Sequence, residues 1–181
     1  MKLVLKHDLY RIKGKFLSKI EFFKEFILHH EVRFLYFYRN DDNFISHLIL
    51  RYIRRKYGLE IYSKSIGGGL YLCHPYMITV NSNAIIGSNC NLNKGCTIGT
   101  EYRGKRKGTP IIGNNVWIGS NSTIVGRITV GDNVLIAPNT HVNSDIPSNS
   151  IVFGNPCQIK NKADATKYYI NNSYCEEERN D

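Results

Sequence analysis

His74 is the side chain whose position in this sequence most strongly indicates chemistry. From Val80 onward an aliphatic residue recurs at every sixth position, and one step back from Val80 falls on His74. An imidazole, with an ordinary pKa of about 6.5, takes up or releases a proton near neutral pH. We therefore predict that His74 fills a slot of the repeat that is otherwise aliphatic and acts there as a general base. The alternative is a histidine at the end of a coil, hydrogen-bonded to backbone.

A basic segment between Ile98 and Ile112 is the second candidate. The repeat resumes there after 14 residues, where two full steps would take 12, so the segment must leave the repeat as a loop. Loops extruded from repeat architectures commonly carry binding functions. Its cations suit phosphate or carboxylate groups, and a merely solvated loop remains the alternative. These cations are Arg103, Lys105, Arg106 and Lys107.

Other chemistries find little support. Between residues 60 and 160 the only histidines are His74 and His141, and the five cysteines form no Cys-x-x-Cys pair, so we predict no metal site. Cys90 and Cys96 fall at small inward positions and are expected to be buried thiols. The glycines at 67–69 lack the Lys-Ser/Thr of a phosphate-binding loop.

Composition bounds the remaining choices. A chain of 181 residues can hold one domain with a small appendage. Its net charge of +9 favours an anionic partner, such as coenzyme phosphates, an acidic polymer or a membrane surface, while no recognised pattern indicates nucleic acid. No apolar run approaches the roughly 20 residues of a membrane span, and the N-terminus lacks a signal-peptide core, so we expect a cytoplasmic protein.

The elements that would position these residues follow from the six-residue period. It matches neither a helix nor an alternating strand, but it does match a parallel β-helix whose stacked aliphatic residues point inward. Glycine or asparagine follows most of the slots, as tight corners require. The ten slots are Val80, Ile86, Leu92, Ile98, Ile112, Ile118, Ile124, Val130, Ile136 and Val142.

Three regions result. Residues 1–59 follow a helical rhythm, with a capping stretch at 40–43 and a helix that Gly58 ends. The outer side of that helix is basic, which suits either solvent or an anionic membrane or substrate. Residues 60–160 form the β-helix with an extruded loop at 99–111. Residues 161–181 are polar and are expected to form a mobile tail.

Several motifs together resemble the serine acetyltransferase branch of the hexapeptide-repeat acyltransferases, over residues 60–160. With its short helical N-terminus, the chain is similar to the O-acetyltransferases of capsule and surface-polysaccharide synthesis. That resemblance implies a left-handed parallel β-helix, a homotrimer, and acetyl-CoA bound in the cleft between adjacent prisms. The motifs are Gly69-Leu70-Tyr71-Leu72-Cys73-His74, the hexads, the loop Gly99–Pro110, and Val152-Phe153-Gly154-Asn155-Pro156.

The resemblance also assigns residues. His74 falls on the family's first catalytic histidine, and Glu60 on the carboxylate that orients it, if one residue is deleted here. Gly108-Thr109-Pro110 replaces an Arg-His-Pro triplet, and Cys73 replaces an aspartate that contacts serine. These changes favour a sugar hydroxyl as the acetyl acceptor. Serine O-acetylation and a non-catalytic β-helix scaffold are the alternatives.

The remaining expectations concern binding. Cys73, Thr109 and Lys107 would contact the acceptor. Backbone near Gly99 would stabilise the oxyanion, while small residues at Gly119 and Ala137 would let the pantetheine arm approach. Arg103, Arg106 and Lys160 would bind the coenzyme phosphates. An acyl-enzyme on Cys73 is a further alternative, although the family transfers the acetyl group directly.

Overall fold

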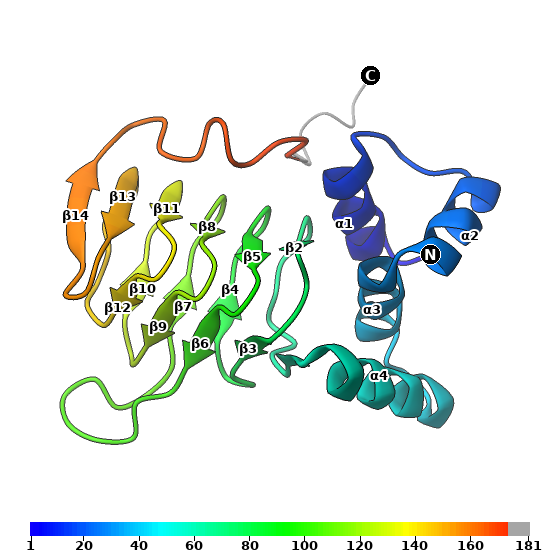
Figure 1. Cartoon of the computed structure of the whole chain (residues 1–181), viewed down its shortest axis with the longest axis horizontal. Helices are drawn as coiled ribbons and strands as arrows, with labels where there is room; N and C mark the ends of the chain where they lie inside the picture. The colour runs from blue at the N-terminus through cyan, green and yellow to red at the C-terminus, as the bar shows by residue number, and fades with distance from the viewer. Residues whose placement is uncertain (174–181) are drawn as a thin grey trace.

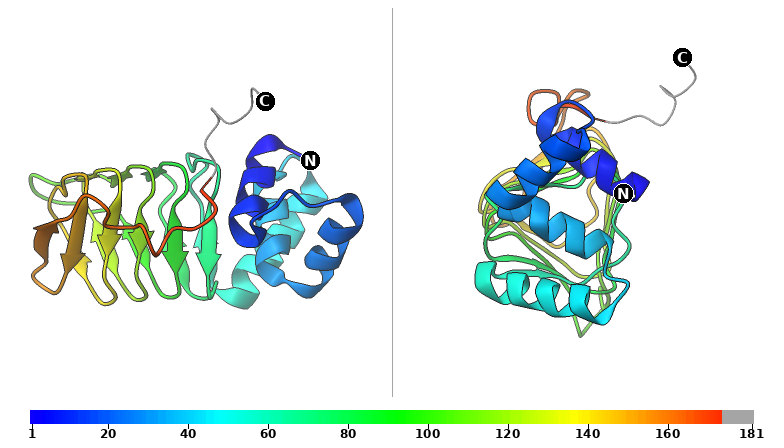
Figure 2. Two further views of the ribbon diagram at one scale, coloured as in Figure 1. Left: turned by 90° about the horizontal axis from the view of Figure 1, so that it is seen from above. Right: turned by 90° about the vertical axis from the view of Figure 1, so that its right-hand side faces the viewer.

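The computed structural model describes residues 1–173 as a helical cap on one end of a three-sided prism (Figures 1 and 2). Local capping signals explain where the helices begin and end. Ser18 and Glu21 form a capping box, the Asn43 side chain accepts from Ser46 N at 2.9 Å, and Gly58 ends the last helix in a left-handed conformation. The helices are α1 (Leu3–Lys13), α2 (Lys19–Leu28), α3 (His30–Arg39) and α4 (Phe44–Tyr57).

The prism is built from short strands that stack in parallel register from coil to coil. One side consists of β1 (Leu59–Ile61), β3 (Ile78–Val80), β6 (Thr97–Gly99), β9 (Thr123–Val125) and β12 (His141–Val142). The second consists of β4 (Ile85–Ile86), β7 (Ile111–Ile112) and β10 (Thr129–Val130). The third consists of β2 (Tyr71–Cys73), β5 (Asn91–Asn93), β8 (Trp117–Ile118), β11 (Val134–Ile136), β13 (Ser150–Phe153) and β14 (Gln158–Asn161), the last pair antiparallel.

The interior confirms the six-residue pattern. All ten predicted slots are no more than 1% exposed and stack along the prism axis. Except after Ile98, where the loop begins, the small or apolar residues four places after the slots are buried too, Cys90 and Cys96 among them, and burial raises the pKa of both thiols to about 12. The predicted fold class, a parallel β-helix with a short α-helical N-terminal segment, is therefore confirmed.

The helical cap is fastened to the first coil by a buried ion pair. Arg39 donates to both oxygens of Asp8, at 2.8 and 3.1 Å, and to the carbonyls of Ile66 and Gly67, each at 2.7 Å. Asp8 also accepts from Leu70 N at 2.8 Å. One guanidinium thus connects α1, α3 and the entry to the prism. None of the helices in the described part is long and apolar enough to cross a membrane.

Residues 162–173, expected to be part of a mobile tail, instead run back along the prism to the helical cap. We call this segment the strap; it is the orange-to-red trace in Figures 1 and 2. Its Thr166 hydroxyl donates to Asn133, Asn91 donates to the carbonyl of Tyr169 at 3.2 Å, and the Tyr169 ring lies 5.0 Å from Trp117. The remaining residues, 174–181, lie outside the described part.

Candidate functional site

His74 lies on a corner of the first coil, and not in the inward slot that the hexad count predicts. Leu72 pairs with Leu92 and Val80 with Ile98, so eight positions separate the first coil's paired residues where the next coil has six. The corner at His74 is therefore two residues longer. For this reason the six-residue spacing between His74 and Val80 does not place His74 inside the prism. The side chain is exposed, which makes it accessible to a substrate.

Backbone contacts hold this corner firmly. His74 adopts φ 51°, and its carbonyl accepts from Tyr76 N at 2.8 Å. Met77 N donates to the carbonyl of Tyr57, at the end of α4, at 3.0 Å. At Gly58, also left-handed, an added Cβ would lie 2.8 Å from Sδ of Met77, so the joint between α4 and β1 packs closely on the corner.

An aromatic cluster that sequence reasoning missed lies beside the corner. The His30 ring stacks on Tyr57 at 4.3 Å and lies 5.2 Å from Tyr76. Burial lowers the pKa of His30, so this ring favours its neutral form. The sequence carried only a weak signal, because the three residues come from α3, α4 and the corner itself.

Glu60 lies on β1 with its side chain exposed on the outer face of the prism. Its register partner is Thr79, and the same outward row continues through Thr97 and Thr123 to His141. Within residues 1–173, no hydrogen bond or ion pair joins Glu60 to His74. Both belong to the first coil, and the corner connects β2 to the strand that pairs with β1.

Cys73 ends β2, directly before His74, and pairs in register with Asn93. It is half-buried, and burial raises the pKa of its thiol. A thiol with a raised pKa is mostly protonated near neutral pH and is a poor nucleophile. The environment of Cys73 therefore does not favour an acyl-enzyme.

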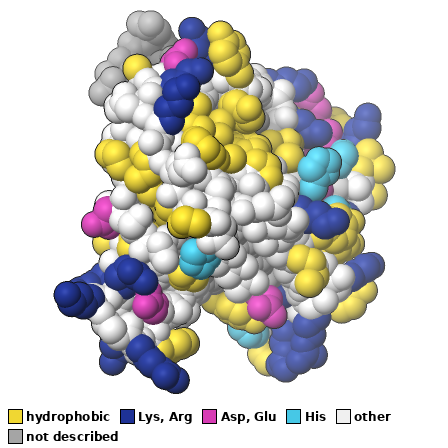
Figure 3. Space-filling view, turned by 60° about the vertical axis from the view of Figure 1, so that its left-hand side comes forward, with side chains coloured by type: hydrophobic (Ala, Val, Ile, Leu, Met, Phe, Trp, Pro, Cys, Tyr) yellow, Lys and Arg dark blue, Asp and Glu magenta, His cyan; other side chains and the backbone are white. Residues whose placement is uncertain are grey.

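The basic loop leaves the prism between β6 and β7. Backbone pairing of Glu101 with Gly108, at 3.0 and 2.9 Å, closes its neck, and Arg106 Nε bonds Glu101 Oε2 at 3.1 Å. Lys107 and the other cations are exposed, and Lys and Arg side chains stand out at the lower left of Figure 3, where the loop projects. Thr109, by contrast, donates its hydroxyl to the carbonyl of Asn83 at 3.1 Å.

A hollow of about 280 Å³ opens at the base of this loop. It brings the predicted phosphate ligand Arg106 together with His141, which sequence reasoning had considered only as a metal ligand. The position of His141 was readable from the pattern, since a residue directly before an inward slot must face outward. Its other lining residues are Thr100, Glu101, Val125 and Asn143.

The predicted coenzyme contacts are spread along the prism. Gly99 ends β6 opposite Val125, and Lys160 lies exposed on β14, at the end farthest from the helices. A Cβ at Gly119 would lie 2.5 Å from the nitrogen of Pro138, so coil stacking alone requires glycine there. Ala137, in the coil stacked on Gly119, accepts bonds from Ser122 and Thr140.

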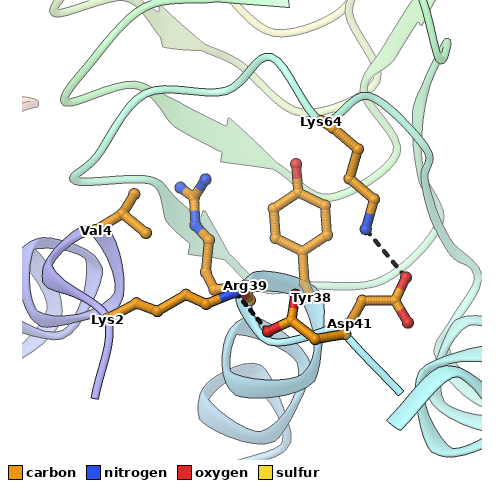
Figure 4. A pocket seen from close by; sticks show the side chains of 7 residues that line it. Lys2, Val4, Tyr38, Arg39, Asp41 and Lys64 are labelled. Atoms are coloured by element: carbon orange, nitrogen blue, oxygen red, sulfur yellow. Dashed lines mark hydrogen bonds and ion pairs between the residues drawn. The ribbon is translucent and has the colours of Figure 1, made fainter. Parts of the chain in front are cut away.

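A second pocket, of about 330 Å³, lies between the helical cap and the prism entry (Figure 4). Lys2 pairs with Asp42 at 2.7 Å, and Lys64 with Asp41 at 3.0 Å. Its lining contains none of the predicted site residues, and these ion pairs occupy its charges. Across residues 1–173, no group of three or more His, Cys, Asp or Glu side chains could hold a metal ion.

Comparisons with known proteins identify a family model and several relatives with similar sequences. Residues 109–144 match the family model described as bacterial transferase hexapeptide (six repeats). The serine acetyltransferase of Helicobacter pylori is 32% identical over 120 residues, which cover 66% of this chain and 70% of the relative. The bifunctional protein GlmU of Streptococcus mutans is 40% identical over 90 residues, but these cover 50% of this chain and only 19% of GlmU.

Solved structures of serine acetyltransferases have a similar fold. The serine acetyltransferase of Neisseria gonorrhoeae in complex with serine superposes with a TM-score of 0.65 at 25% identity, over 87% of this chain and 67% of that one. A serine acetyltransferase in complex with CoA gives a TM-score of 0.67 at 20% identity, over 87% and 68%. Coverage of several relatives is partial, and the chain spans about half, 48%, of the Synechococcus elongatus serine acetyltransferase.

Proposed function

This chain belongs to the serine acetyltransferase family of hexapeptide-repeat transferases, and from that premise we propose that it transfers an acetyl group from acetyl-CoA to a hydroxyl group. The observation that carries the proposal is the exposed imidazole of His74 on a backbone-fixed corner of the prism. A non-catalytic scaffold would have no need of an accessible base held in this way.

The chemistry needs a base at the acceptor oxygen. His74 takes the hydroxyl proton while that oxygen attacks the thioester carbonyl and forms a tetrahedral oxyanion. As the carbon–sulfur bond breaks, the imidazolium returns the proton to the departing thiolate. Glu60 would orient the imidazole and stabilise its charged form, which requires a closer approach than the single chain has.

The donor would be bound by the loop and the outer faces of the prism. The exposed cations Arg103, Lys105 and Lys107, with Arg106 at the hollow beside His141, suit the phosphates of CoA. One relative was solved with CoA, which supports the same donor here. We further propose a homotrimer, in which the cleft between two prisms brings the loop of one copy near the corner of another.

The comparisons favour serine as the acceptor over the sugar that the sequence indicated, because the match covers 70% of the Helicobacter pylori serine acetyltransferase but only 19% of the Streptococcus mutans GlmU, and a similar solved structure is a serine acetyltransferase. A sugar hydroxyl stays as the second candidate on one specific observation. The loop ends in Gly108-Thr109-Pro110, and Thr109 donates its hydroxyl to backbone, so this position offers no cation or imidazole to a free amino acid.

An acceptor panel with acetyl-CoA tests this function. The purified full chain is incubated with free serine, with nucleotide sugars and with oligosaccharides, and release of CoA thiol is recorded for each. We expect release that requires an acceptor hydroxyl. If no acceptor raises release above that of the enzyme-free reaction, acetyl transfer is wrong.

The matched variants are His74→Ala and His47→Ala, both exposed histidines. Loss of the base should reduce kcat by roughly 10²–10⁴-fold, while His47→Ala, on the outer side of α4, should retain wild-type turnover. Thermal melts of both variants serve as a control for folding. Wild-type turnover of His74→Ala would remove this residue from the mechanism.

A further inference from the structure

The outer face of α4 combines apolar and cationic side chains and no acidic ones. At 3.6 residues per turn, seven exposed residues lie within an arc of about 140°. We call this set the α4 face. It consists of Phe44, Ile45, Leu48, Arg51, Tyr52, Arg55 and Lys56. The exposure is large for the apolar members, at 75% for Phe44, 69% for Ile45 and 46% for Leu48.

The opposite side of α4 accounts for why this face stays outside. Ser46, Leu50 and Ile53 are buried against the rest of the chain, and both ends of the helix are capped. Arg54, between the two sides, donates to the carbonyl of Ile61 at 2.7 Å. The helix is therefore fixed in its rotation, and the α4 face remains exposed.

A second exposed apolar stripe lies on α2, which belongs to the same helical end of the molecule (Figure 2). Ile20 is 85% exposed and Phe23 64%, with Lys19 and Lys24 beside them. The two acids of α2 are already paired with lysines, Glu21 with Lys15 at 2.5 Å and Glu25 with Lys13 at 2.7 Å. The cations that remain unpaired give this end a positive surface around its apolar residues.

We propose that the α4 face docks on an anionic lipid bilayer. Amphipathic helices that combine bulky apolar residues with Lys and Arg lie in the membrane interface, where acyl chains accept the former and headgroups the latter. A second copy is the weaker occupant, because a two-fold contact brings the same patch of both copies together, and the α4 face carries three cations and no acid to pair with them.

Docking would also orient the rest of the molecule. The last turn of α4 joins the corner of His74 through the bond from Met77 N to the Tyr57 carbonyl. The basic, C-terminal end of the α4 face thus leads into the residues that are bonded to the corner of the proposed base. A membrane-docked enzyme would therefore hold this corner close to the lipid headgroups, where an acceptor attached to lipid would be found.

Vesicle co-sedimentation of the full chain tests the proposal. Vesicles of phosphatidylcholine alone are compared with vesicles that also contain phosphatidylglycerol, with no substrate present, so that failure here leaves acetyl transfer untouched. We expect binding only to the anionic vesicles, weakened by added salt. Absence of binding to them would overturn the proposal.

Three matched variants locate the surface. Arg51→Gln with Arg55→Gln and Lys56→Gln should weaken binding by roughly 100-fold. Phe44→Ser with Ile45→Ser and Leu48→Ser should weaken it by at least 10-fold at unchanged charge. The control, Arg103→Gln with Lys105→Gln and Lys107→Gln, removes the same charge from the loop and should retain binding.

Two results would count against docking through α4. If the loop control loses as much affinity as the α4 variants, the attraction is nonspecific charge. If analytical ultracentrifugation shows that the α4 variants alone dissociate an assembly of the wild type, the face belongs to a second copy. Thermal melts confirm that each variant is folded.

Discussion

His74 has a backbone conformation that few residues other than glycine adopt, with φ 51°. Holding it there costs roughly 1 kcal/mol, and such costs are commonly found at functional sites, where the surrounding structure fixes a side chain in place. Here Tyr76 and the adjoining Met77, also left-handed, supply the constraint. The corner thus presents the imidazole from rigid backbone.

Glu60 gives the first prediction at this scale. Glu60→Gln keeps the size of the side chain but removes the charge that would stabilise the imidazolium, so kcat should fall, though by less than in His74→Ala. Steady-state kinetics with saturating acetyl-CoA measures the difference. Because no hydrogen bond or ion pair joins Glu60 to His74 in the described residues, unchanged kcat would mean that Glu60 is no part of the mechanism.

Cys73 gives the second prediction at the scale of single residues. Burial raises the pKa of its thiol, so at pH 7 to 8 the reactive thiolate should be scarcer than in an ordinary cysteine, and alkylation by iodoacetamide correspondingly slower. Cys73→Ser should keep turnover within a few-fold of wild type. Mass spectrometry of the acid-quenched enzyme should find no acetyl group on Cys73, and a stable acetyl-cysteine would contradict direct transfer.

At the scale of elements, the Asp8–Arg39 pair joins two helices to the first coil. Arg39→Met leaves Asp8 buried without its cation, and should lower the free energy of unfolding by about 3–5 kcal/mol in urea titrations. The control Lys2→Met breaks an exposed pair with Asp42 and should change it by less than about 1 kcal/mol. Equal losses in the two variants would show that the buried pair has no special role.

The same pair has a pH signature. Burial raises the pKa of Asp8, and Arg39 opposes that shift. An acid whose pKa is raised in the folded state loses stability as pH rises from its unfolded value to its folded one. The deficit of Arg39→Met should therefore shrink as the pH is lowered toward 4. Doubling with Asp8→Asn, which removes the stranded charge, should recover part of the loss at neutral pH.

Periodicity predicted the prism well because each slot is set by local contacts that repeat. The ten slots from Val80 to Val142 all point inward, and Asn43 and Gly58 cap α4 as expected. The corner of His74 was not predicted, because two extra residues in a turn shift the six-residue count without changing any residue type. The path of the strap and the buried Asp8–Arg39 pair were not predicted either, because both depend on contacts between residues remote in sequence, for which a single sequence gives no signal.

At the scale of the whole molecule, the strap can be followed through the chain's one tryptophan, since the Tyr169 ring lies 5.0 Å from Trp117. Tyr169→Ala should move the fluorescence maximum of Trp117 to longer wavelength and lower the stability by about 1 kcal/mol. Tyr168→Ala, whose ring is 78% exposed, is the control and should change neither. An unchanged spectrum for Tyr169→Ala would mean that the strap does not cover Trp117 in solution.

Stacked coils touch only their neighbours, so an ordinary solenoid can fray one coil at a time from a free end. In this chain the segment after β14 returns past the middle coils, and Asn172 reaches the carbonyl of Arg11 in α1 at 3.4 Å. The first and last coils are thereby coupled by two routes, through the stacked coils and through the returning segment. Loosening one end must also disturb the other, and the stack should melt as a single cooperative unit.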